Sequence, residues 1–231
     1  MTRKIKIIII IAVILVGASL FLYTNFSGNS STNSGHWEND VGTVNKTVYG
    51  NANAKTEMVL IAGIHPREPL SIEPEIKAAE EFAKNNDVKF TVYHVNVTKD
   101  ATDYDKSREN GEGLVHDFVM PDVINNTHAD SIIISHSHIE GYGQGFYLAT
   151  PAMDNASVAI AQKIANESSF NYFPRNTSQP VQATSAKLVS IPLAEAGNPT
   201  FVYEIPENIT DQDSTDKALE LFGLMFNIVK K

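Results

Sequence analysis

Met58-Val59-Leu60-Ile61-Ala62-Gly63-Ile64-His65-Pro66-Arg67-Glu68 is an apolar run that ends in a turn carrying a histidine and a glutamate. The uninterrupted apolar residues predict a strand buried on both faces, as in the centre of a parallel sheet. An imidazole and a carboxylate three residues apart can hold a divalent metal and leave part of its coordination sphere open. This stretch therefore predicts a central strand and half of a metal site.

Shorter apolar runs at 90–97, 132–134 and 201–203 predict further buried strands. Helical spacing of apolar residues alternates with them. It predicts a helix capped by Ser71 and reaching about residue 84, a short one at 114–120 stopped by Pro121, one at 156–165, and a last one capped by Ser214. Strands alternating with helices predict an α/β layered domain, with a mostly parallel mixed sheet flanked by helices.

Polar side chains stand where three of these predicted strands end. His65 and Glu68 follow the first strand, His136 and His138 follow the run at 132–134, and Glu204 ends the last. Ligand sites in open α/β sheets lie beyond the carboxyl ends of the strands, so we expect these groups to meet in one crevice. Strand alternation puts His136 and His138 on the same face, and either of them could be the second histidine of the site.

The residue types in this crevice suit one kind of chemistry. Two histidines and one glutamate form the three-ligand set that catalytic zinc sites use, with a position left for water. Bound zinc lowers the pKa of that water and polarises a carbonyl. Glu204, as a carboxylate that does not bind the metal, can take the proton of the water and pass it to a leaving amine. The pattern predicts a hydrolase of amide bonds with one zinc ion.

The turn Gly63-Ile64-His65-Pro66-Arg67-Glu68 resembles the zinc-binding turn of the M14 metallocarboxypeptidases, whose pattern is Gly-Ile-His-x-Arg-Glu. Ile134-Ser135-His136-Ser137 is similar to their third-ligand segment, and Phe201-Val202-Tyr203-Glu204 to the strand with their catalytic glutamate. The resemblance covers roughly Met58 to the C-terminus of a short, divergent chain. It implies a zinc-carboxypeptidase-like fold, one zinc ion on His65, Glu68 and His136, and Glu204 as general base and acid. It leaves His138 as a substrate-binding wall of the pocket or as a hydrogen-bond donor to a metal ligand.

Two arginines are candidates for binding substrate. The related succinylglutamate desuccinylase–aspartoacylase branch has Gly-x-His-Gly-x-Glu, so Arg67 favours the carboxypeptidase side of the superfamily. The carboxypeptidases usually have an Asn-Arg pair that grips a substrate carboxylate, and here Ser107 precedes Arg108 instead. Arg108 is the best candidate for such a clamp, because guanidinium pairs with carboxylate through two parallel hydrogen bonds. Arg67 either contacts substrate or orients Glu68.

Composition excludes other classes of site and partner. The formal net charge is −9, and no basic stripe exists to neutralise phosphates, which argues against nucleic acid. The 231 residues include no cysteine, so a metal must be held by His, Asp or Glu. A chain of this length can bury one core and is expected to form a single globular domain.

The first residues predict where the protein resides. Arg3, Lys4 and Lys6 precede an uncharged run, Ile7 to Tyr23, which is typical of a signal anchor that keeps its positive flank inside. We expect an anchor at residues 1–24, a polar tether at 25–36 and the catalytic domain at 37–231; a secreted protein with a cleaved signal peptide is the alternative. Glycosylation sequons begin at Asn25, Asn29, Asn45, Asn96, Asn125, Asn155, Asn166, Asn176 and Asn208, which favours an outward-facing glycoprotein.

Together these observations predict a single-pass, membrane-anchored extracytoplasmic zinc hydrolase that cleaves amide bonds. A carboxypeptidase-type metallopeptidase with a zinc-activated water is the leading interpretation, and its substrate is a peptide or an acylated amino acid. One alternative is an N-acyl amino acid deacylase of the succinylglutamate desuccinylase–aspartoacylase type. Another is a non-catalytic surface binding domain on the same fold.

Overall fold

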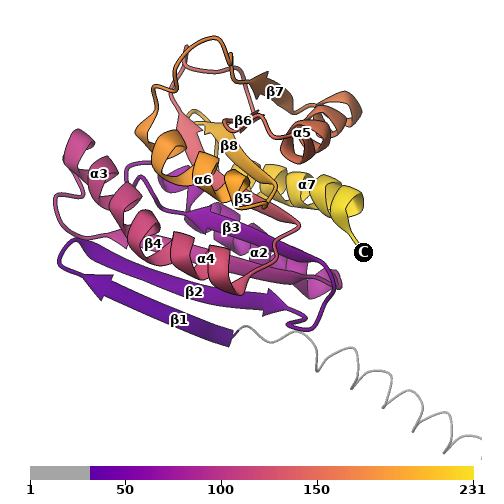
Figure 1. Cartoon of the computed structure of the whole chain (residues 1–231), viewed down its shortest axis with the longest axis horizontal. Coiled ribbons are helices and arrows are strands. Elements are labelled where there is room, and N and C mark those ends of the chain that lie inside the picture. Colours follow the sequence, from indigo (N-terminus) through magenta and orange to yellow (C-terminus); the bar gives the residue numbers. More distant parts are fainter. Residues whose placement is uncertain (1–31) are drawn as a thin grey trace, which may run out of the picture. The chain divides into compact units, whose positions relative to one another are not determined.

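The computed structural model describes residues 32 to 231, which form an eight-stranded sheet with helices on both faces (Figure 1). The strands are β1 (Thr32–Asn39), β2 (Gly42–Gly50), β3 (Glu57–Ala62), β4 (Lys89–Val97), β5 (Ser131–His138), β6 (Tyr147–Thr150), β7 (Asn171–Pro174) and β8 (Thr200–Pro206). The helices are α2 (Glu73–Asn85), α3 (Tyr104–Leu114), α4 (Met120–Asn126), α5 (Asn155–Glu167), α6 (Ile191–Glu195) and α7 (Asp211–Val229), with short helical turns η1 (Pro69–Ser71), η2 (Val115–Val119) and η3 (Ala186–Ser190).

The sheet is mixed, and its centre is parallel. The strand order is β1-β2-β4-β3-β5-β8-β6-β7. Strands β4, β3, β5 and β8 run parallel to one another. Strand β2 is antiparallel to both β1 and β4, and β6 is antiparallel to β8 but parallel to β7. The carboxyl ends of the four parallel strands therefore share one edge of the sheet. This confirms the layered α/β architecture expected from the alternation of strands and helices.

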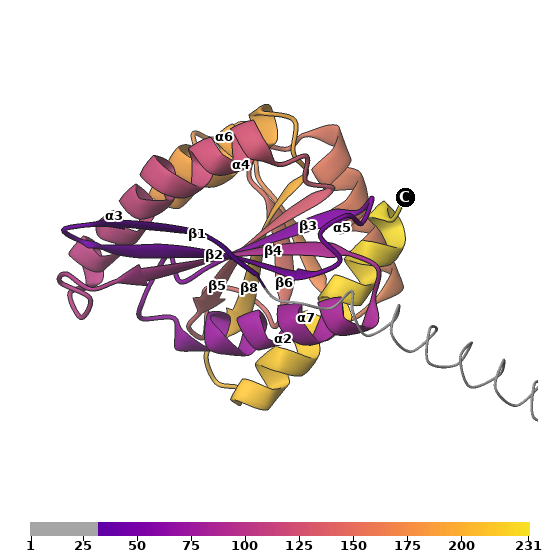
Figure 2. The same cartoon turned by 90° about the horizontal axis from the view of Figure 1, so that it is seen from below.

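Two apolar cores lie on the two faces of the sheet. Helices α2, α5 and α7 cover one face, where Phe82, Phe90 and Phe222 meet edge to face, and α3, α4 and α6 cover the other (Figure 2). Strand β3 lies between the two cores, and all of its residues are buried. Its side chains alternate between the cores, which explains why its sequence is apolar without interruption.

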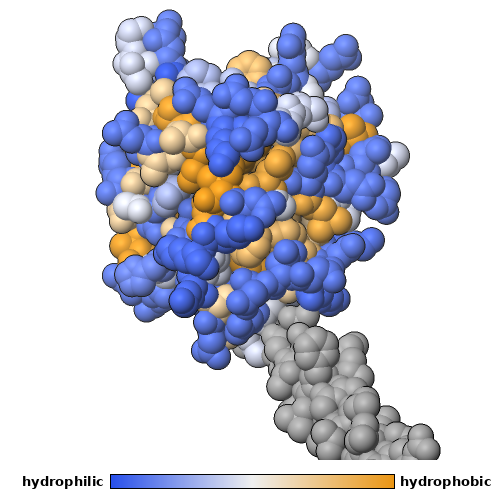
Figure 3. Space-filling view, turned by 90° about the vertical axis from the view of Figure 1, so that its right-hand side faces the viewer, coloured by the Kyte–Doolittle hydropathy of each residue, from blue (hydrophilic) through white to orange (hydrophobic). Residues whose placement is uncertain are grey.

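On the side of the molecule turned to the viewer in Figure 3, apolar residues lie between hydrophilic ones.

Three expected helix boundaries are wrong. Ser71 does not cap α2: it belongs to η1, its hydroxyl donates to the Glu68 carbonyl at 2.8 Å, and the N-cap of α2 is Ile72.

The N-cap of α7 is Thr210, four residues before Ser214, and the Thr210 and Asp213 side chains form a reciprocal capping box. Ser214 is inside the helix, and its hydroxyl donates to the Leu70 carbonyl at 2.7 Å. Pro121 does not stop a helix either. It lies in the first turn of α4, where a missing N–H costs no hydrogen bond, directly after the wider turn η2.

The predicted anchor at residues 1–24 and most of the tether lie outside the described residues. Residues 32–36 were expected to be the last part of the tether. They belong instead to β1, which pairs with β2. Polar residues are sufficient there, because an edge strand is held by backbone hydrogen bonds to its neighbour. Within residues 32–231, no helix is both long enough and apolar enough to cross a membrane.

Candidate metal centre

The turn that follows β3 is shaped by a glycine. Gly63 has a φ of 88°, and a Cβ at this position would lie 2.1 Å from the Val95 carbonyl oxygen. Only glycine combines this left-handed backbone with so close an approach to β4. The turn closes with the Glu68 N–H donating to the His65 carbonyl at 3.1 Å. The chain therefore reverses direction just beyond the sheet edge, and His65 and Glu68 face each other.

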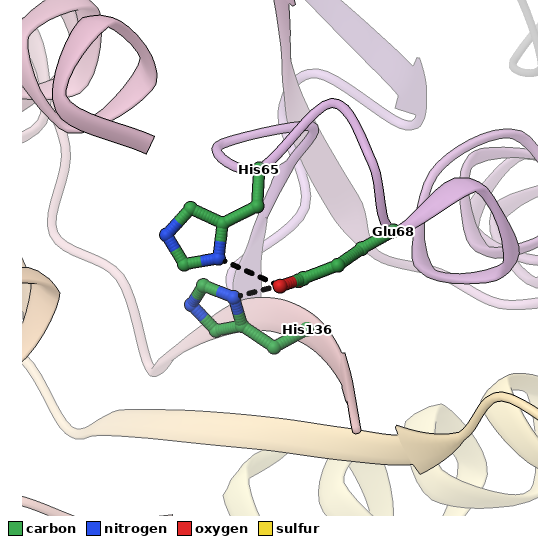
Figure 4. A group of neighbouring side chains, drawn as sticks. All are labelled: His65, Glu68 and His136. Carbon is green, nitrogen blue, oxygen red and sulfur yellow. Dashed lines mark hydrogen bonds and ion pairs between the residues drawn. The ribbon is translucent and has the colours of Figure 1, made fainter. Parts of the chain in front are cut away.

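His65, Glu68 and His136 converge on one point (Figure 4). Their nearest possible ligand atoms all lie within 4.8 Å of one another, and all three residues are buried. His65 Nδ1 is 2.9 Å from Glu68 Oε1, and His136 Nδ1 is 3.1 Å from Glu68 Oε2. Two imidazole nitrogens and a carboxylate that converge in a buried place form the donor set of a catalytic zinc site. This cluster is therefore a candidate metal centre.

The structure distinguishes between the two histidines of β5. His136 points to Glu68, whereas the His138 ring is engaged elsewhere, with its Nε2 2.9 Å from the Gly145 carbonyl oxygen. Two residues along a strand are about 6.8 Å apart, so side chains on the same face do not reach the same point. Strand alternation by itself left both histidines open. The turn that carries Glu68 selects His136 as its neighbour.

Helix α3 supplies two charged residues beside this cluster. A Cβ at Gly111 would lie 1.7 Å from the Ile64 carbonyl oxygen, so the helix packs directly on the turn only because this residue is glycine. Arg108 Nη1 donates to Glu68 Oε1 at 3.0 Å. Glu112 Oε1 lies 3.5 Å from His65 Nε2. The expected substrate clamp, Arg108, therefore contacts a candidate metal ligand in this structure.

Glu112 was missed by the sequence analysis. It is 3% exposed, and its Oε1 also accepts a hydrogen bond from Thr184 Oγ1 at 2.9 Å. A carboxylate beside the ring of a metal-binding histidine orients the ring and raises its basicity. The available signal was its position four residues after Arg108, because residues four apart lie on the same face of a helix.

Neighbouring groups of opposite charge favour the charged forms of Glu68, His65 and Glu112. Burial raises the pKa of Glu68, but hydrogen bonds and charge from His136 and His65 outweigh it, and the net pKa lies far below the ordinary value. Burial lowers the pKa of His65, but Glu112 and Glu68 outweigh it, so this pKa lies above its ordinary value. Burial also raises the pKa of Glu112, yet His65 and Thr184 keep it below its ordinary value. Glu68 is thus a carboxylate, the form that binds metal.

Glu204 lies on β8, directly opposite His136 on β5. It is half-buried, and its Oε2 is a buried atom without a hydrogen-bond partner. Burial raises the pKa of Glu204 to about 7, with His136 opposing the rise and Glu68 adding to it. A carboxyl group with a pKa near neutrality that forms no hydrogen bond is suited to accepting and releasing a proton.

The two predicted substrate-binding arginines lie against one tyrosine. The Arg67 and Arg108 guanidinium carbons are 5.6 Å and 5.3 Å from the centre of the Tyr104 ring. Arg67 is exposed and Arg108 is partly buried. A cleft of about 570 Å³ opens on this side of the metal centre; its lining is Tyr104, Asp105, Arg108, Glu109, Glu112, Gly113, His116, Thr184 and Leu188. Arg108 therefore contacts Glu68 and lines the cleft, whereas Arg67 is exposed on the Tyr104 ring.

Another carboxyl group is buried on the α2 side of the sheet. Glu75 is 0% exposed, and neither oxygen forms a hydrogen bond of regular geometry. Burial raises the pKa of Glu75 well above its ordinary value; the Ser135 hydroxyl opposes the rise and the charge of Glu204 adds to it. The folded protein therefore holds this side chain as a neutral acid.

Replacing this acid should stabilise the protein in a pH-dependent way. We expect Glu75→Gln to raise the free energy of unfolding at pH 8 and to leave it nearly unchanged at pH 4. Above the ordinary pKa of 4.5, the wild type must take up a proton to fold. Its stability then falls by about 1.4 kcal/mol per pH unit until the folded-state pKa is reached. Glutamine needs no proton.

Chemical denaturation of both proteins at pH 4, 6 and 8 measures this difference. Glu81→Gln, on an exposed position of the same helix, is the matched control and should show no such trend. An equal effect of Glu75→Gln at all three pH values would contradict the assignment of a neutral buried acid.

Comparison with known proteins gives a likeness of fold without a likeness of sequence. No family model matches the chain, and no curated protein matches it. A metallo-carboxypeptidase from Burkholderia cenocepacia is 14% identical over 87% of this chain, with a TM-score of 0.50. A provisionally assigned carboxypeptidase from Burkholderia mallei is 16% identical over 92%, with a TM-score of 0.54. The product-bound cell shape determinant protein Csd4 from Helicobacter pylori is 13% identical over 80%, with a TM-score of 0.50.

This chain spans 64%, 67% and 55% of the lengths of those three chains, in that order. The likeness extends over most of the present chain. The domain described by residues 32–231 has the metallo-carboxypeptidase fold.

Proposed function

We propose that the protein is a zinc-dependent hydrolase of amide bonds, most closely a carboxypeptidase-type metallopeptidase. The observation that carries this proposal is the buried convergence of His65, Glu68 and His136, with the unpaired carboxyl group of Glu204 beside it. The fold shared with metallo-carboxypeptidases supports it. Carboxyl groups with strongly shifted pKa values cluster at functional sites, and Glu204 lies across from His136 with a buried oxygen that has no hydrogen-bond partner.

The three side chains suit one zinc ion. Two neutral imidazoles and one carboxylate match the softness and the charge that zinc prefers, and three protein ligands leave a position open. When bound, zinc would supply Lewis acidity that polarises a carbonyl and lowers the pKa of a water. His65 Nδ1, His136 Nδ1 and the Glu68 carboxylate would hold it.

Glu204 would move the proton. As a carboxylate it takes a proton from the attacking water, and as an acid it gives that proton to the leaving amine. Both steps need a group whose pKa lies near the working pH, and the pKa of about 7 meets this need. Arg108 and Arg67 would supply positive charge where negative charge develops on the substrate oxygen or stands on a substrate carboxylate.

Glu112 would position His65 for the metal. We expect Glu112→Ala to weaken zinc binding by about 10- to 100-fold, because the His65 ring loses the carboxylate that orients it. Competition with a chelating dye measures this affinity. Glu109→Ala removes the same charge from an exposed position on the same helix and should leave zinc binding nearly unchanged. Equal losses in the two variants would show a general effect of charge instead.

A substrate comparison tests the proposed reaction. The zinc-loaded protein should cleave N-acylated dipeptides with a free C-terminal carboxylate faster than the same dipeptides with an amidated C-terminus. Turnover of small acylated amino acids without turnover of peptides would favour the deacylase alternative. No turnover of any amide, with zinc bound and peptide binding retained, would favour a binding domain.

We also propose that the catalytic domain is anchored in the cell membrane and faces outwards. The uncharged run from Ile7 to Tyr23 behind Arg3, Lys4 and Lys6 supports this location, as do the nine sequons. Peptides outside the cell would then be the accessible substrates. Protease added to intact cells should digest the domain, and protection from the protease would place it inside.

A further inference from the structure

The buried acid Glu75 lies behind the two strands that carry His136 and Glu204. The Ser135 hydroxyl, next to His136 in the chain, is near enough to Glu75 to oppose the rise in its pKa. Tyr203, next to Glu204, is directly opposite Ser135, and the charge of an ionised Glu75 would act on its phenol. Side chains alternate along a strand, so Ser135 and Tyr203 point away from the metal centre. Glu75 therefore meets β5 and β8 from behind the metal centre.

The stretch of chain that carries Glu75 also carries the metal ligand Glu68. Glu68 is the N-cap of η1, and α2 begins one residue after η1 ends. Backbone hydrogen bonds run along the stretch. The Ser71 N–H donates to the Glu68 carbonyl at 3.1 Å, and the Ile76 N–H donates to the Ile72 carbonyl at 3.0 Å. A displacement of the start of α2 is therefore transmitted to Glu68.

Helix α7 and the sheet hold this stretch between them. The Ser214 hydroxyl donates to the Leu70 carbonyl at 2.7 Å, and the Thr215 hydroxyl donates to the Pro74 carbonyl at 3.3 Å. On its other side, η1 packs against β5 and β8. Glu75 is fully buried in this position, so its carboxyl group reaches water only if the start of α2 moves.

An ionised Glu75 would meet charge of its own sign. The charge that acts on its pKa is that of Glu204, which is also negative, and Ser135 and Tyr203 are neutral hydroxyl groups. His136 lies on the other face of the sheet. Further titratable groups on the neighbouring parts of α2, α7, β2 and β4 are all at least partly exposed: Glu73, Lys77, Asp211, Asp213, Asp216, Lys217, Glu220, Tyr49 and His94.

We propose that Glu75 is a positioning residue of the metal centre: as an uncharged acid it holds the start of α2 against β5 and β8, and it thereby fixes Glu68 beside His136. A buried charge without a partner is strongly unfavourable, so an ionised Glu75 moves towards water. The start of α2 then leaves the strands and displaces Glu68. This inference rests on the zinc site of the proposed function, and it adds that zinc binding weakens in alkaline solution.

Zinc affinity measured from pH 6 to pH 10 in chelator-buffered zinc tests this role. Glu75→Gln keeps nearly the same shape and has no proton to lose, so its affinity should equal that of the wild type at pH 6. Once Glu75 ionises in the metal-free protein, the wild-type affinity should fall relative to that of Glu75→Gln by about tenfold per pH unit, because zinc binding then takes up one proton. Glu81→Gln, exposed on the same helix, is the matched control and should follow the wild type.

A ratio of the two affinities that stays constant from pH 6 to pH 10 would overturn the proposal, because a purely structural effect of the substitution does not depend on pH. Loss of zinc that occurs only together with loss of the circular dichroism signal would also overturn it, since the whole protein then unfolds. The measurement does not involve turnover. A protein that binds zinc without cleaving amides would therefore refute the hydrolase function and leave this inference standing.

Hydrogen exchange of the metal-free protein tests the same movement if the wild type binds no zinc and the metal centre fails separately. After correction for intrinsic exchange rates, residues 68–76 should exchange faster in the wild type than in Glu75→Gln at pH 9, and equally fast at pH 6. Residues 104–114, in α3 on the other face of the sheet, should show no such difference. Equal protection of residues 68–76 in the two proteins at both pH values would refute the inference.

Discussion

Glu204→Gln should reduce the turnover of an amide substrate by about 10²- to 10⁴-fold, the range that general acid–base groups contribute. Glutamine has nearly the same shape but cannot accept the proton of the attacking water or deliver one to the leaving amine. Zinc content should stay at the wild-type level, because the metal-binding atoms of His65, Glu68 and His136 are unchanged. Steady-state kinetics and metal analysis of the same preparations measure both quantities.

Glu207→Gln is the matched control for this substitution. Glu207 is exposed just beyond the end of β8, and its contact is with the Ser137 hydroxyl at 3.2 Å. The Glu207→Gln variant should retain most of the wild-type activity. Unchanged turnover in Glu204→Gln would refute the proposed mechanism. A wild type that binds peptides without cleaving them would refute catalysis itself and leave the metal centre as part of a binding domain.

His65→Ala and His136→Ala should each lose zinc and, with it, activity. The loss of affinity should exceed the 10- to 100-fold that removal of an outer partner costs, because a ligand bond itself is removed. Each variant also leaves a carboxylate oxygen of Glu68 without its histidine partner. Metal analysis after dialysis against a defined zinc buffer measures the effect.

His138→Ala is the control that separates the two histidines of β5. Its ring contacts the Gly145 carbonyl rather than Glu68, so zinc should stay bound. If His138→Ala loses zinc and His136→Ala keeps it, the third ligand is His138, and the assignment of His136 from its contact with Glu68 is wrong. Circular dichroism of each variant distinguishes loss of metal from loss of fold.

Local features of the centre could be read directly from the chain. His65 and Glu68 are three residues apart in one turn, and Gly63, which permits that turn, is adjacent in sequence. The ends of the buried strands could also be read, because an apolar run that stops at a polar residue marks the edge of the sheet. Since parallel strands end together, this pattern by itself predicts that Glu204 lies near the metal centre.

Features that depend on packing between elements could not be read in this way. Strand alternation makes His136 and His138 equivalent. Glu68, on the turn after β3, contacts His136, whereas His138 contacts the Gly145 carbonyl. The approach of α3 depends on Gly111 meeting the Ile64 carbonyl, a contact between residues far apart in the chain. That approach places Arg108 on Glu68 and Glu112 on His65. No periodicity in the sequence encodes such distances.

By itself the sequence determined the layered α/β class, the first pair of candidate ligands and the carboxylate beside them, because each follows from hydrophobic period and from spacing within a few residues. Strand alternation left two histidines open and only the resemblance favoured His136, whose contact with Glu68 the tertiary structure shows. Tertiary structure alone decided which carboxylate lies beside His65, and that β6 lies beside β8 with Tyr147 opposite Glu204. The reason is physical. Side-chain contacts across strands and helices depend on register and on close approach of backbones, and both are set only when the whole sheet is assembled.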